Sequence, residues 1–339
     1  MILHPAIVAL LFASVLVTLM VLFASSFGWK IIRYWDIASG SERQLALERS
    51  TYLVSTLLAC AFAFQIGSLF LYVYTADDLH TRFVGAMCAA GSLNVNRYGY
   101  PGLFLKILNC ILAGLWLIMN HADSRAHDYP LIRKKFILLI LIAPFAAAET
   151  AVQTMYFAEL RPDVITSCCG SLFSSNQKTI PGELISLPKA PVALAFYASL
   201  ILLFAAGFRY WWKGQGGRLF SLSSVITFAV FALALVSFIS LYFYELPTHH
   251  CPFCILQGEY GHIGYLFYGT LIGGVVCGAG VGLLEPFGRI GSLGRIVPLI
   301  NRKLSAVSIG CYLLFAAVSI WKILTADLTL DFAYVAFAF

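Results

Sequence analysis

Eight long apolar runs dominate the sequence, and each is long enough for one helix to cross a lipid bilayer. A spanning α-helix needs about 20 apolar residues, because each residue advances the helix by about 1.5 Å. Backbone amides must find partners inside lipid, which favours helices, and the runs lack the alternation of a β-barrel. The expected spans are residues 5–27, 51–75, 102–120, 136–158, 191–209, 219–244, 263–285 and 304–324.

The composition supports a membrane protein. Only 11% of the residues are charged and 60% are hydrophobic, whereas soluble domains carry roughly 25% charged residues. The first run has no Lys or Arg before it and is too long for the apolar core of a signal peptide, so we expect it to remain as a span. The sequence therefore predicts an all-α, polytopic transmembrane helical bundle, with residues 1–339 forming a single integral membrane domain in a lipid bilayer.

Basic residues divide the connections between spans into two sets, which predicts the orientation. Cytoplasmic connections of membrane proteins are enriched in Lys and Arg. Most of the 22 basic residues fall in alternate connections, which we therefore place in the cytoplasm of a bacterium: Lys30, Arg33, Arg43, Arg49, Arg125, Arg133, Lys134, Lys135, Arg209, Lys213, Arg218, Arg289, Arg295, Arg302 and Lys303. Both termini and the loops 76–101, 159–190 and 245–262 are then periplasmic, outside the inner membrane. Because topology explains the net charge of +6, we expect no nucleic-acid partner.

Cysteines are concentrated on the expected outer face. Four of the nine cysteines lie inside spans, where a cysteine usually behaves as a small buried hydrophobic residue. No cysteine falls in an expected cytoplasmic loop. The other five lie in the three outer loops and are the candidate functional residues: Cys88, Cys168, Cys169, Cys251 and Cys254.

The sharpest local motif is the C-x-x-C pair formed by Cys251 and Cys254, which His249 and His250 precede. Pro252 suits the first position of a helix, so we expect a helix to begin near Cys251 and to continue toward the seventh span. The positive end of a helix dipole lowers the pKa of a nearby thiol. Cys251 is therefore the expected exposed, reactive thiol, and Cys254 is its resolving partner.

Three functions are compatible with these cysteines. The first is a membrane thiol–disulfide oxidoreductase in which Cys251 and Cys254 exchange disulfides with a second pair, Cys168 and Cys169. Cys88 is a further candidate for the same chemistry. The electrons would pass to a quinone or to a periplasmic thioredoxin-like protein.

Two resemblances accompany the redox interpretation. The tetrapeptide Cys251-Pro-Phe-Cys254 resembles the active-site motif of glutaredoxin-like proteins. The layout of the cysteines is similar to that of membrane thiol oxidoreductases of the DsbB and vitamin K epoxide reductase type. Those enzymes combine a C-x-x-C pair with a second cysteine pair at the outer face and pass electrons to a quinone. They have fewer helices than this chain, so the resemblance is one of arrangement.

The second function is that of a permease or accessory subunit that handles a soft metal or a sulfur compound. Thiolates and imidazoles suit Cu(I) or Zn(II), and the candidate ligands are His249, His250, Cys251 and Cys254. Alternatively, one of Cys168 or Cys169 joins Cys251, Cys254 and His250 in a tetrahedral site. The third is a structural subunit of a larger membrane complex, in which disulfides brace the outer loops. No glycine-rich nucleotide-binding motif is present, so any use of ATP would require another membrane subunit.

Two charged residues lie inside expected spans, where isolated charges are costly. Glu149 is 13 residues from the start of the fourth span, which places it roughly 20 Å deep. Lys106 enters the third span from the opposite side to a comparable depth. We therefore expect a contact between Glu149 and Lys106, either as a structural ion pair or as a proton relay beneath the cysteine loops.

Overall fold

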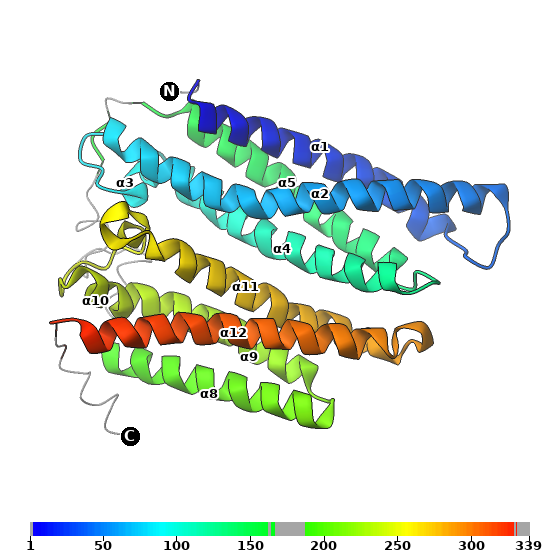
Figure 1. Cartoon of the computed structure of the whole chain (residues 1–339). Helices are drawn as coiled ribbons and strands as arrows, with labels where there is room; N and C mark the ends of the chain where they lie inside the picture. The colour runs from blue at the N-terminus through cyan, green and yellow to red at the C-terminus, as the bar shows by residue number, and fades with distance from the viewer. Residues whose placement is uncertain (1–2, 162–163, 167–186, 329, 331–339) are drawn as a thin grey trace. The chain divides into compact units, whose positions relative to one another are not determined.

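The computed structural model describes residues 3–161, 164–166, 187–328 and 330 (Figure 1). Among these residues, eight helical segments are long and apolar enough to cross a membrane, which confirms the expected spans. Each segment consists of one of the following helices or starts with it: α1 (Pro5–Tyr34), α2 (Glu42–Asp78), α4 (Gly99–Arg125), α5 (Ile132–Ala158), α8 (Lys189–Lys213), α9 (Gly217–Ala234), α11 (Ile263–Leu284) and α12 (Ile296–Thr325). A π-helical turn, Leu235–Ile239, joins α9 to α10 (Ser240–Tyr244), and the short helix α3 (Ala89–Leu93) precedes α4.

The helices extend beyond the expected spans at the ends that carry basic residues. Helix α1 continues past Lys30 and Arg33, and α2 begins before Arg43 and Arg49. Lys and Arg are good helix formers, and their long side chains carry the charge away from the apolar segment. Many of the basic residues expected in loops therefore lie in the terminal turns of helices. The side of the membrane on which the termini lie stays a prediction.

The described residues divide into two compact units. The first unit contains the described residues of 1–75, 96–161 and 283–300. The second contains those of 76–95, 162–282 and 301–339. The expected single membrane domain stays a prediction.

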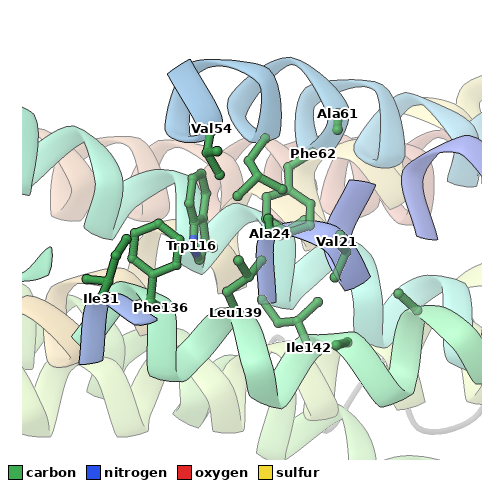
Figure 2. Close-up of a cluster of buried hydrophobic side chains, with 14 of the residues drawn as sticks. Val21, Ala24, Ile31, Val54, Ala61, Phe62, Trp116, Phe136, Leu139 and Ile142 are labelled. Carbon is green, nitrogen blue, oxygen red and sulfur yellow. The ribbon is translucent and has the colours of Figure 1, made fainter. Parts of the chain in front are cut away.

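The apolar core of the first unit lies between α1, α2, α4 and α5 (Figure 2). The rings of Phe62 and Trp116 meet edge to face with centroids 5.1 Å apart. The indole N–H of Trp116 donates to the backbone oxygen of Lys135 at 3.1 Å. A Cβ atom at Gly28 would lie 2.7 Å from Cδ1 of Phe136, so the absence of a side chain at Gly28 permits α1 to approach α5 closely.

Small residues bring α9, α11 and α12 together in the second unit. The hydroxyls of Ser224 and Ser308 donate to the backbone oxygen of Gly274 at 3.3 and 2.8 Å. The Tyr312 hydroxyl donates to the Ser224 oxygen at 2.9 Å. A Cβ atom at Gly278 would lie 1.9 Å from the Ser224 hydroxyl oxygen. Glycine and hydroxyl side chains therefore allow close backbone packing and link the three helices by hydrogen bonds.

Candidate functional site

Three cysteines of the second unit form a buried sulfur cluster, which we define as Cys88, Cys251 and Cys254. Their sulfur atoms all lie within 4.8 Å of one another. Cys88 Sγ and Cys251 Sγ are 3.5 Å apart, although 163 positions separate the two residues in the sequence. Three of the five expected outer cysteines are thus brought together. The other two, Cys168 and Cys169, lie outside the described residues.

Contacts on both sides of Cys88 fix its position. Cys88 is the residue before the first turn of α3. The backbone N–H of Ala89 donates to Asp77 Oδ1 at 3.0 Å, which ties α3 to the end of α2. Gln257 Nε2 donates to the backbone oxygen of Met87 at 2.7 Å. One contact therefore comes from the helix before Cys88 and the other from the loop that carries the C-x-x-C pair.

Two tyrosine hydroxyls hold the backbone around the C-x-x-C pair. Tyr244, the last residue of α10, donates to the backbone oxygen of Cys251 at 2.5 Å and accepts from the N–H of Ile255 at 3.0 Å. The Tyr268 hydroxyl, from α11, donates to the backbone oxygen of Pro252. These side chains supply hydrogen-bond partners that a regular helix would otherwise provide for its own backbone.

The helix expected to begin near Cys251 is not formed, so that prediction is wrong. Two 3₁₀ turns, Cys254–Leu256 and Gly258–Tyr260, follow the pair instead, and α11 begins only at Ile263. Glycines at 258 and 261 disfavour a continuous α-helix, and Gly261 has a φ of +62°. Cys251 is therefore not at an α-helix N-terminus, and the dipole argument for its reactivity does not hold.

The exposure of the two thiols also differs from the expectation. Cys251 is 0% exposed and Cys254 is 6% exposed, and Cys88 is as fully buried as Cys251. Cys251 is thus not an exposed thiol. Because the sulfurs are sheltered by the surrounding protein, they contact one another more readily than they contact a molecule from solution.

The two histidines before the pair have different partners. His249 Nε2 lies 3.3 Å from Cys254 Sγ. Burial lowers the pKa of His249, and the nearby Cys88 only partly offsets this effect, so burial favours the neutral imidazole. His250 Nδ1 donates to the backbone oxygen of Val236 in the π-helical turn at 3.1 Å, and burial lowers the pKa of His250 as well. Of the two expected imidazole ligands, His249 therefore adjoins the cluster, whereas His250 forms a hydrogen bond with the backbone.

The turn around Cys88 is also tied to the chain that precedes the second cysteine pair. The backbone N–H of Thr166 donates to the Val84 oxygen, and its hydroxyl donates to the Gly91 oxygen, both at 3.0 Å. Gly85 has a φ of +87°, and a Cβ atom there would lie 2.4 Å from the Thr166 backbone oxygen. Glycine at this position is what permits the close approach.

A separate buried polar cluster in the first unit contains the two intramembrane charges. Lys106 Nζ lies 2.8 Å from Glu149 Oε1, which confirms the expected contact. Gln65 Nε2 and Asn109 Nδ2 each donate to Glu149 Oε2 at 2.6 Å. Lys106 also donates to the Ser68 hydroxyl at 3.3 Å. The carboxylate thus accepts three N–H groups, which is the arrangement of a compensated ion pair. A proton-relay role for Glu149 and Lys106 stays a prediction.

Several residues that build these sites were not anticipated from the sequence. Tyr244 is the last residue of α10 and Tyr268 lies in the second turn of α11, so the two tyrosines precede and follow the C-x-x-C loop in the sequence. Asn109 lies three residues after Lys106 and therefore on the same helix face. Asp77 carries no such signal, because its contact depends on how the loop before α3 folds back.

No family model, curated protein or solved structure matches this chain.

Proposed function

We propose that the protein is a membrane thiol–disulfide oxidoreductase whose reactive sulfurs are those of Cys88, Cys251 and Cys254. The observation that carries this proposal is the 3.5 Å separation of Cys88 Sγ and Cys251 Sγ. Disulfide exchange requires a thiolate to reach a disulfide sulfur directly. Two sulfurs already in van der Waals contact need little movement to do so.

The proposed exchange moves one disulfide within the cluster. In the oxidised form, Cys251 and Cys254 share the bond. The Cys88 thiolate attacks Cys251 Sγ, a Cys88–Cys251 bond forms, and the electron pair of the broken bond leaves on Cys254 Sγ. The proton lost by Cys88 ends on Cys254, and His249, with Nε2 3.3 Å from Cys254 Sγ, is placed to transfer it. This step changes the position of the disulfide and leaves the number of oxidised cysteines unchanged.

Turnover requires a second thiol pair that a partner can reach, because the cluster is buried. We assign this role to Cys168 and Cys169. Thr166, two positions before Cys168 in the sequence, is hydrogen-bonded to the turn around Cys88. A dithiol of a periplasmic thioredoxin-like protein would reduce this second pair, and two electrons and two protons would pass through the cluster to a membrane quinone, giving a quinol.

The location proposed for this chemistry is the outer face of a bacterial inner membrane. The eight apolar helices make the chain a multi-pass membrane protein. The distribution of basic residues supports placing the cysteine loops on the periplasmic side. Disulfides persist in that compartment and are rare in the cytoplasm.

The proposal is tested by following the cysteine oxidation state in isolated membranes. A maleimide reagent of known mass, applied after denaturation, counts the reduced thiols on a gel. We expect the count to fall when a water-soluble quinone is added and to rise when a dithiol is added, and we expect Cys251→Ser to abolish the part of this change that involves Cys88. Cys110→Ser, which removes a buried cysteine of the first unit, is the matched control and should behave as wild type apart from its missing thiol. An identical thiol count under all conditions would overturn the proposal.

A further inference from the structure

We infer that the sulfur cluster, in its reduced form, binds one thiophilic d10 metal ion, Cu(I) or Zn(II), through Cys88, Cys251 and Cys254. The bond from a metal to a thiolate is about 2.3 Å, so three sulfurs around one ion lie about 4 Å apart. The three sulfurs here lie within 4.8 Å of one another, and one pair is 3.5 Å apart. The cluster therefore already has nearly the dimensions of a three-sulfur site.

Electrostatics favours a cation at the centre of this cluster. All three thiols are buried, with Cys254 the most exposed at 6%. Thiolates brought this close in a poorly hydrated environment repel one another. A metal ion replaces that repulsion by attraction, and it compensates charge that a buried environment solvates poorly.

The ligand set selects soft ions over hard ones. Among the described residues, the group that converges here consists of three cysteines and contains no carboxylate. Mg²⁺ and Ca²⁺ require oxygen ligands, whereas thiolates prefer Cu(I) and Zn(II). Three sulfurs complete a trigonal Cu(I) site. Zn(II) needs a fourth ligand. His249 Nε2 lies 3.3 Å from Cys254 Sγ, but His249 is not part of the converging group. Its side chain would therefore have to shift to bind the ion.

Metal binding and the proposed disulfide exchange use the same sulfurs but do not depend on one another. A disulfide removes two of the three ligands, so the oxidised cluster does not bind the ion. A bound ion in turn protects the thiols from oxidation, because the thiolate lone pair that attacks a disulfide is engaged by the metal.

The inference is tested on the full chain, purified in detergent and reduced under anaerobic conditions. Cu(I) is titrated in competition with bathocuproine disulfonate, and Zn(II) in competition with a chromophoric chelator. We expect one ion per chain for at least one of the two metals. Because loss of a residue outside the metal's own ligands already costs about 10–100-fold in affinity, Cys88→Ala and Cys254→Ala should each weaken binding by at least about 100-fold. Cys110→Ala and Cys277→Ala are matched controls that should bind as wild type.

A second measurement covers the case in which a cysteine variant does not fold. Wild-type protein oxidised with diamide should lose metal binding and regain it after reduction, with no change of sequence. Absence of binding by the reduced protein, or wild-type affinity in Cys88→Ala, would overturn the inference. Disulfide mapping of the metal-free Cys254→Ser variant separates the two proposals. A Cys88–Cys251 disulfide without metal binding by wild type would overturn metal binding alone, and metal binding without that disulfide would overturn the exchange alone.

Discussion

Replacing Lys106 by Met leaves the Glu149 carboxylate buried without a cation. The two side chains are 1% and 2% exposed, and their charged atoms are 2.8 Å apart. Removing one partner of such a pair costs roughly 3–5 kcal/mol, because the remaining charge is neither solvated nor compensated. Gln65 and Asn109 still donate to the carboxylate, so we expect a loss near the lower limit, about 3 kcal/mol.

A double-mutant cycle shows whether this cost arises from the pair. Glu149→Gln alone leaves a buried ammonium group and should cost a similar amount. The double variant Lys106→Met/Glu149→Gln contains no buried charge, and replacement of a whole buried ion pair is often nearly neutral. We therefore expect the double variant to be at least about 2 kcal/mol more stable than the sum of the single effects predicts.

The assay is unfolding in detergent micelles, followed by circular dichroism. The control is Glu245→Gln, which removes the ion pair between Glu245 and Lys322. The side chains of Lys322 and Glu245 are 21% and 44% exposed. Exposed pairs contribute about 0–1 kcal/mol. If Lys106→Met is no more damaging than Glu245→Gln, or if the two single effects add, the assignment of a compensated ion pair is refuted.

Two further variants test the packing and the site. Gly278→Ala places a methyl group 1.9 Å from the Ser224 hydroxyl oxygen and should cost about 1–3 kcal/mol of stability in the same unfolding assay. The control Gly310→Ala meets nothing within 4 Å and should be neutral or slightly stabilising. Equal effects of the two variants would contradict the packing assignment. Tyr244→Phe removes the hydroxyl that bonds the backbone oxygen of Cys251, which should cost about 1–3 kcal/mol and speed alkylation of the native protein at Cys251. An unchanged alkylation rate would show that this hydroxyl does not hold the loop.

The spanning helices were predictable because lipid restricts the choices open to an apolar run. The helix ends were not, since Lys30 and Arg43 are compatible with both a loop and a helix, and the structure places them inside α1 and α2. The contact of Glu149 with Lys106 was predictable from depth alone, because the rise of a helix fixes where each charge lies and lipid penalises an isolated one.

The sulfur cluster was only partly predictable. The pattern of charges predicted that Cys88, Cys251 and Cys254 share one side of the membrane, but it contained no information about which loops meet. Local sequence around Pro252 was compatible with a helix start, but the glycines at 258 and 261 disfavour its continuation. The hydroxyl of Tyr244 in α10 also bonds the backbone of the loop at Cys251, and a contact of this kind is not visible in the local sequence.

The meeting of Cys88 with Cys251 is tested most directly in a variant that retains only these two cysteines. After mild oxidation in membranes, mass spectrometry of the digested protein should find a disulfide between them in most molecules. The control variant retains only Cys251 and Cys277. Cys277 lies nine residues beyond Tyr268, about 13 Å further along α11, so this control should form no intramolecular disulfide. Failure of Cys88 and Cys251 to pair, or equal pairing in the control, would contradict the cluster and both proposals built on it.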